Sequence, residues 1–124
     1  MVFDWAKYLV LAEELGTSRM NEAALRSAIS RAYYATFCKA RNHLRHEGVR
    51  IPNTGKAHKI VWGNFRNDID QHRRSIGITG DRLRQSRNKA DYEDEFPNVT
   101  KVVQDSISKA KRLLETLENL DGEP

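Results

Sequence analysis

The sequence contains a single cysteine, Cys38, and therefore has no second thiol with which to close an internal disulfide. This fits a reducing compartment, and we expect a cytoplasmic location. No apolar run approaches the length of a membrane span, and the N-terminus lacks the basic flank and apolar core of a signal peptide. The sequence thus predicts a folded protein without a membrane partner.

The signatures of several enzyme classes are missing as well. The chain has no Gly-rich phosphate loop, no nucleophile elbow and no Cys-His signature. His43 and His46 are close in sequence, but without further ligands at a fixed spacing such a pair is typical of a polar helix end. Cys38 lies in an apolar stretch, which favours a buried thiol over a reactive one. We therefore expect neither a metal ion nor a cofactor.

Apolar residues recur at the three- and four-residue spacing of helices, and the period-two alternation that marks strands is absent. With 124 residues, the chain has the length of one compact domain, which we place at 1–124 with 121–124 as a frayed tail. The predicted fold is an all-α, antiparallel bundle of about five helices with short connections. The expected helices cover 4–15, 22–46, 57–68, 81–92 and 97–120, of which the second and fifth are the longest.

A few residues indicate where these helices begin or break. Asn21 is a natural N-cap for the second helix, and Asp81 can cap the fourth. Gly77 and Gly80 bracket a short segment in which we expect a break. Pro97 suits the first turn of the fifth helix.

The predicted helix at 22–46 has an apolar stripe wide enough for a central position in the bundle. Beside the stripe runs a second line of residues at helical spacing, with an Arg and a Tyr among small side chains. We expect this line to approach another surface, either the fourth helix or a partner subunit. Its members are Ser27, Arg31, Tyr34 and Cys38.

The formal net charge of +4 is distributed unevenly along the chain. Residues 1–38 are neutral, residues 39–90 carry thirteen Lys/Arg against four Asp/Glu, and residues 91–124 carry four against nine. A basic middle favours an anionic partner such as nucleic acid or a nucleotide. The alternative is that the acidic last helix packs beside the basic middle and neutralises it.

The segment Leu83–Tyr92 gathers polar side chains on one face of its predicted helix. At 100° per residue, four of them fall within an arc of about 100°: Arg84, Arg87, Asn88 and Asp91. Arginine forks bind phosphate bidentately, and carboxylate and amide groups can orient them. The alternative is a simple intrahelical ion pair between Arg87 and Asp91, worth about 0.2–0.5 kcal/mol.

Two segments together resemble a known family. Arg26–Phe37, with its Ser-Arg-Ala-Tyr-Tyr run, is similar to the long helix of prokaryotic HEPN domains. Leu83–Tyr92, with its Arg-Asn-Lys-Ala-Asp-Tyr run, is similar to the helix that carries the polar motif of the family. The resemblance extends over nearly the whole chain and implies a small all-α bundle that pairs as a homodimer. Many HEPN domains are metal-independent ribonucleases, and many act as toxins or are paired with a minimal nucleotidyltransferase.

The HEPN ribonuclease motif consists of an Arg, often a polar residue after it, and a His a few residues farther on. Arg87 and Asn88 match its first half, but Tyr92, Glu93 and Asp94 occupy the window of the histidine. An imidazole can shuttle protons at neutral pH, whereas a tyrosine, with a usual pKa of about 10, is a poor base there. The resemblance therefore implies an RNA- or nucleotide-associated protein that is non-catalytic or weakly catalytic.

Three functions stay open on this evidence. The first is a partner of a nucleotidyltransferase in a toxin–antitoxin-like pair, which binds RNA or a nucleotide. The second is a metal-independent endoribonuclease toxin that uses Arg87, Asn88 and Tyr92. The third is a purely structural subunit of a dimer. The residues that we expect to bind the ligand in the first case are Arg31, Arg84, Arg87, Asn88 and Asp91.

Overall fold

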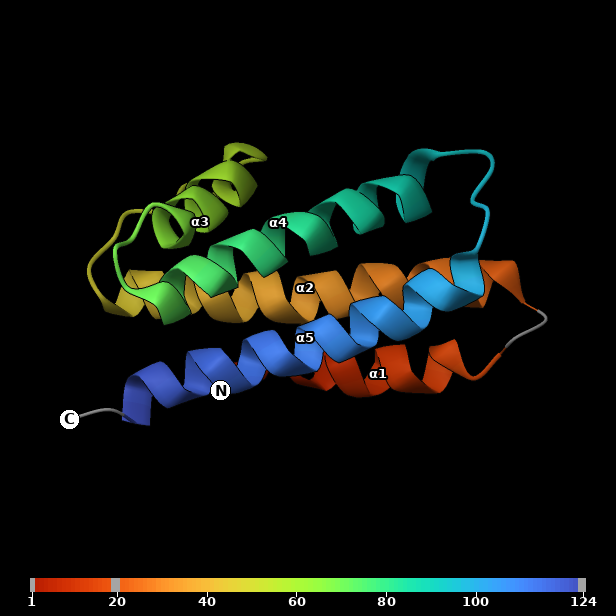
Figure 1. The fold of residues 1–124 in the computed structure, drawn as a ribbon, viewed down its shortest axis with the longest axis horizontal. Coiled ribbons are helices and arrows are strands. Elements are labelled where there is room, and N and C mark those ends of the chain that lie inside the picture. The colour runs from red at the N-terminus through yellow and green to blue at the C-terminus, as the bar shows by residue number, and fades with distance from the viewer. Residues whose placement is uncertain (1, 19–20, 123–124) are drawn as a thin grey trace.

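Five helices make up the part of the chain that the computed structural model describes, residues 2–18 and 21–122 (Figure 1). None of these described residues forms a strand, so the predicted all-α class is confirmed. None of the five described helices is both long enough and apolar enough to cross a membrane. The helices are α1 (Lys7–Gly16), α2 (Glu22–His46), α3 (Lys56–Arg66), α4 (Gln71–Tyr92) and α5 (Val99–Gly122).

Helix α2 is the centre of the bundle and contacts each of the other four helices. Its N-cap is Asn21, as predicted, and the Asn21 side-chain oxygen accepts a hydrogen bond from the Ala24 N–H at 3.1 Å. The chain turns away after α2 at Gly48, whose φ of 89° favours glycine. The largest fully buried apolar side chains of the core are Leu25, Ile29, Tyr33, Leu44, Val61, Trp62, Phe65, Ile76, Leu83 and Val103.

The helices differ in direction relative to α2. Helix α3 runs parallel to α2, since Tyr33 packs beside His58 and His43 beside Phe65. Figure 1 shows α1 and α4 antiparallel to α2, whereas α5 returns beside α4 in the direction of α2. The first half of α2 therefore lies beside the last turns of α4, where Arg26 donates a hydrogen bond to the Ala90 carbonyl. This topology brings the two segments that carry the HEPN resemblance side by side.

Helix α4 is longer than predicted and contains no break. It begins after Asp70, whose carboxylate accepts a hydrogen bond from the Arg73 N–H at 2.9 Å. From there it continues through Gly77 and Gly80 to Tyr92. The predicted N-cap at position 81 was therefore wrong, since that residue lies in the interior of the helix.

Gly77 and Gly80 mark the place where α4 packs closely against α3. A Cβ atom at position 77 would lie 2.3 Å from the backbone nitrogen of Arg66. A Cβ atom at position 80 would lie 2.3 Å from ring carbons of Trp62. The two helices can approach this closely only without these side chains. The contact offsets the cost of glycine in a helix, which is about 1 kcal/mol per residue.

Two helices begin later than predicted. The first, α1, begins at Lys7, because the Asp4 carboxylate accepts the Ala6 N–H at 3.0 Å in a turn that precedes the helix. The fifth, α5, begins at Val99 rather than at residue 97, because Asn98 has a φ of 61°, which interrupts a right-handed helix. At its other end α5 includes residues 121–122 of the predicted tail, and residues 123–124 lie outside the described residues.

Replacing Gly80 by alanine should lower the free energy of unfolding by about 1–3 kcal/mol, because the added methyl group overlaps the buried Trp62 ring. Gly63→Ala is the matched control. Position 63 lies in α3 with nothing within 4 Å of its Cβ position, so alanine there should raise the free energy of unfolding by about 0.5–1 kcal/mol. Urea denaturation measures both. A stabilised Gly80→Ala protein would contradict the close packing of α4 on α3.

Candidate functional site

Arg87 lies at the centre of the polar face of α4 and is buried, with only 8% of its surface exposed. Its guanidinium carbon lies over two tyrosine rings of α2, 5.2 Å from the centroid of Tyr33 and 5.2 Å from that of Tyr34. A cation over an aromatic face is stabilised by about 2 kcal/mol when it is desolvated. The two rings therefore help to keep a charged group in a position that is largely closed to water.

The hydrogen bonding of Arg87 is incomplete. Its Nη1 atom lies 3.6 Å from Oδ2 of Asp91, which is longer than a hydrogen bond. Its Nε atom is buried and has no hydrogen-bond partner within the described part of the chain. A buried donor without a partner costs about 1–3 kcal/mol, and more when the group is charged. The intrahelical ion pair considered as an alternative thus exists, but it does not satisfy the guanidinium.

The polar face is fixed against α2 by two further contacts. Oδ2 of Asp91 accepts a hydrogen bond from the hydroxyl of the buried Ser30 at 3.4 Å. The Arg26 guanidinium donates to the backbone carbonyls of Ala90 and Glu93, where α4 ends. Carbonyls in the last turn of a helix have no partner within the helix, so Arg26 supplies one. These contacts set the register of the last turns of α4 along α2.

The other predicted residues on α4 are more exposed than Arg87. Arg84 donates two hydrogen bonds to Oδ1 of Asp81, at 3.1 and 2.9 Å, and 34% of its side chain is exposed. Asn88 is half-buried beside it in the helix. Tyr92, which occupies the histidine window of the HEPN motif, is 77% exposed. Helix α4 thus presents a partly exposed rim around a buried arginine.

Arg31 is directed toward a different helix. Its guanidinium carbon lies 5.0 Å from the ring centroid of Tyr8 in α1, and within the described residues it forms no hydrogen bond or ion pair with α4. Its role in ligand binding therefore stays a prediction. In the same line of α2, Tyr34 does reach α4 through Arg87, and Cys38 is buried, which raises the pKa of its thiol.

Sequence reasoning missed a hydrogen-bond network behind Arg87. The hydroxyl of the fully buried Tyr33 accepts a hydrogen bond from the Trp62 indole N–H at 3.0 Å and lies 2.5 Å from Nδ1 of His58. We assign the one proton of the Tyr33 hydroxyl to a hydrogen bond toward Nδ1 of His58, since the Trp62 N–H already donates to that hydroxyl. The neutral imidazole therefore carries its own proton on Nε2.

Both titratable members of this network are held in their neutral forms. Burial raises the pKa of Tyr33. Burial lowers the pKa of His58, and the charges of Arg87 and Arg84 lower it further. The only signal in the sequence was the spacing of His58 and Trp62, four residues apart and so on one face of a helix. The third partner, Tyr33, is too far away in sequence for periodicity to reveal it.

Within residues 99–120, the acidic helix α5 forms its ion pairs with itself and with α1. Its ion pairs among the described residues are Lys109–Asp105 within the helix and Lys111–Glu13 with α1. Lys59 in α3 is exposed, as are neighbouring lysines. The exposed lysines Lys56 and Lys59 of α3 and Lys89 of α4 therefore leave positive charge at the surface of these two helices.

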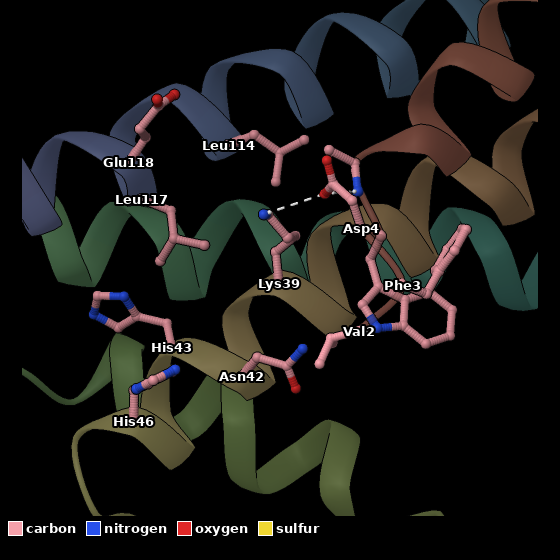
Figure 2. A pocket seen from close by; sticks show the side chains of 12 residues that line it. Val2, Phe3, Asp4, Lys39, Asn42, His43, His46, Leu114, Leu117 and Glu118 are labelled. Carbon is pink, nitrogen blue, oxygen red and sulfur yellow. Dashed lines mark hydrogen bonds and ion pairs between the residues drawn. The ribbon is translucent and has the colours of Figure 1, made fainter.

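A hollow of about 750 Å³ lies elsewhere in the molecule, between residues 2–6, the second half of α2 and the end of α5 (Figure 2). Asp4 and Lys39 both line it and form an ion pair of 3.4 Å. Leu114 and Leu117 of α5 lie on its other side (Figure 2). None of the predicted site residues lines this hollow, so it is separate from the polar face of α4.

Comparison of the sequence with known protein families identifies the class to which this helical bundle, with its polar α4 face, belongs. A family model of the HEPN domain matches residues 12–120. This chain therefore belongs to the HEPN family, and the resemblance based on its two helical segments is confirmed. A relative in Methanocaldococcus jannaschii, the uncharacterized protein MJ0992, is 32% identical over an alignment that covers 86% of this chain and 70% of the relative. The comparison with solved structures found no match.

The lowered pKa of His58 predicts a pH dependence of stability. The unfolded chain, in which a histidine has its usual pKa of about 6.5, takes up a proton before the folded chain does. The contribution of His58 is therefore present above pH 6.5 and is lost as the pH falls toward the lower folded-state pKa. Denaturation at pH 7.5 and 5.5, chosen as about one unit on either side of that value, should show a smaller loss in His58→Asn than in the parent. Equal losses would contradict a neutral His58.

Proposed function

We propose that this HEPN protein binds a phosphate-bearing ligand, RNA or a nucleotide, through the face of α4 that contains Arg84, Arg87, Asn88 and Asp91. The observation that carries the proposal is the buried Nε–H of Arg87 without a partner. A phosphate offers oxygens in the geometry of the guanidinium fork. Asp91, whose carboxylate lies 3.6 Å from Nη1 of Arg87 and whose side chain is 30% exposed, is the neighbour past which a ligand reaches the arginine.

The surrounding charge supports an anionic ligand. Lys56 and Lys59 in the first turn of α3 and Lys89 in α4 are exposed. Exposed lysines attract a polyanion over a distance of about 8–10 Å at ordinary salt, without selecting a particular geometry. We therefore assign attraction to the lysines and selective binding to Arg87.

In this proposal the protein binds RNA or a nucleotide and does not cleave it appreciably. Tyr92 stands where the ribonuclease motif has its histidine, and a tyrosine is a poor proton acceptor at pH 7. The ribonuclease alternative is tested by incubating the protein with labelled RNA in EDTA. We expect intact RNA. Cleavage that disappears in Arg87→Lys would instead favour the metal-independent ribonuclease.

The proposal includes two protein partners that are typical of the family. One is a second copy of the chain, with the α4 faces of the two subunits close together and the exposed Tyr92 beside the seam. A polar arc of this kind is poor core material but can line a wet cleft between subunits. The other is a minimal nucleotidyltransferase in a toxin–antitoxin-like pair, for which the first test is whether a neighbouring gene encodes such an enzyme and whether the two proteins copurify.

Light scattering should report a homodimer at tens of micromolar, an order-of-magnitude choice well above the dissociation constant of an ordinary interface. Reversing the charge of a rim residue, as in Arg84→Glu, should weaken the dimer if the α4 faces meet, because each face then loses the Arg84–Asp81 ion pair and carries two neighbouring carboxylates that repel those of the other face. The exposed Lys101→Glu on α5 is the matched control and should leave the mass unchanged. A monomeric parent would count against the paired faces.

Arg87→Lys should weaken binding of a short RNA or of ATP about ten- to a hundredfold, although the charge is kept. Lysine cannot reproduce the guanidinium fork, and a lost charge-assisted hydrogen bond costs about 1.5–3 kcal/mol. Asn88→Ala should weaken binding less, because it removes a neutral partner. Filter binding at two salt concentrations measures these effects.

Lys59→Ala is the control for charge alone. It should have a small effect that shrinks further at high salt, because an exposed lysine contributes long-range attraction. The circular dichroism spectrum and melting temperature of each variant establish that it is folded. If folded Arg87→Lys binds like the parent while Lys59→Ala loses binding, the basic surface is the whole of the interaction and the specific site is wrong.

A further inference from the structure

His58 lies outside the α4 motif, yet it packs on the same two aromatic rings as Arg87. The centroid of its imidazole is 5.6 Å from that of Tyr33 and 6.1 Å from that of Tyr34. The guanidinium carbon of Arg87 is 5.2 Å from each of the same rings. The tyrosine pair of α2 therefore packs against an imidazole from α3 and a guanidinium from α4, and the charge of Arg87 is close enough to lower the pKa of His58.

The two ring nitrogens of His58 have different environments. Nδ1 is occupied by the Tyr33 hydroxyl at 2.5 Å, and the other side of that hydroxyl is occupied by the Trp62 N–H at 3.0 Å. Nε2 carries the proton and forms no hydrogen bond with any described residue of the chain. The side chain is half-buried rather than enclosed, so part of it is open to a ligand. It lies in the first turn of α3, where the helix dipole favours anions.

We propose that His58 is a ligand-binding residue of this site, whose Nε2–H donates a hydrogen bond to the phosphate group that Arg84 and Arg87 bind. This inference rests on the proposed function and adds to it a neutral donor from a third helix. The phosphate of an RNA backbone and that of a free nucleotide share this chemistry. The binding experiments therefore use three probes, which are short RNA, ATP and inorganic phosphate.

The same hydrogen bonds exclude His58 as a substitute for the missing motif histidine. A general base needs a free lone pair, but Nε2 carries a proton and the lone pair of Nδ1 accepts the Tyr33 proton. Reversing the tautomer would leave the Tyr33 hydroxyl proton in the core without the acceptor that it now has. His58 therefore donates to a ligand and does not take a proton from it. Its presence agrees with binding in the absence of strong cleavage.

The two amide side chains separate the roles of the two nitrogens. In His58→Asn the amide oxygen takes the place of Nδ1, so the acceptor for Tyr33 is kept and the ligand donor is lost. In His58→Gln the amide nitrogen takes the place of Nε2, so the donor is kept and the acceptor is lost. We expect His58→Asn to bind short RNA about tenfold more weakly than the parent. His58→Gln should bind more tightly than His58→Asn but melt at a lower temperature.

A spectrum of the parent protein gives a readout that does not depend on a variant folding. Long-range ¹H–¹⁵N correlation of the histidine rings should show His58 protonated on Nε2 and unprotonated on Nδ1. Addition of inorganic phosphate, ATP or short RNA should shift the Nε2 signal for each probe that binds. A response to RNA alone identifies the backbone as the source of the phosphate, and a response to ATP identifies a nucleotide.

The outcomes separate this inference from the proposed function. If Arg87→Lys loses binding while His58→Asn binds like the parent, the function stands and the role of His58 is wrong. Equal losses in folded His58→Asn and His58→Gln also overturn it, because the ring and not its donor then matters. An Nδ1-protonated His58 overturns it as well. If the parent binds none of the three probes, both proposals fall.

Discussion

The burial of one cation, Arg87, against two tyrosine rings constrains how three helices fit together. A desolvated guanidinium needs compensating contacts, and the rings of Tyr33 and Tyr34 supply them. Tyr33 in turn buries its hydroxyl and needs polar partners, which Trp62 and His58 of α3 provide. The position of one charge on α4 thus determines what α2 and α3 must contribute.

The glycines of α4 are required by the same packing of α3 against α2 and α4. Trp62 can reach the Tyr33 hydroxyl only if α3 lies close to both α2 and α4, and a side chain at position 80 would overlap its ring. A glycine that is unfavourable for an isolated helix is therefore favourable in this bundle. Local propensity and tertiary packing conflict here, and packing decides, because a buried tryptophan contributes more than the roughly 1 kcal/mol that a helical glycine costs.

This conflict also shows what the sequence could and could not predict. Helix α2 was predicted to the residue, because its N-cap Asn21 and its periodicity are local features. The first turns of α4 were missed, because the role of Gly77 and Gly80 depends on α3. The arc of polar residues on α4 was visible from periodicity, but the burial of Arg87 was not, since it depends on rings that lie more than fifty residues earlier in the chain. The pairing of His58 with Tyr33 was hidden for the same reason.

The central claim is that Arg87 holds a buried donor, its Nε–H, for a phosphate. The ¹H–¹⁵N signal of that group, assigned by its absence from the Arg87→Lys spectrum, tests the claim most directly. On addition of short RNA, the account predicts that this signal shifts and that its proton exchanges more slowly with water, as expected of a newly formed charge-assisted hydrogen bond. An unchanged Arg87 Nε–H signal in a sample where RNA binding is established by shifts of the α3 lysines would contradict it.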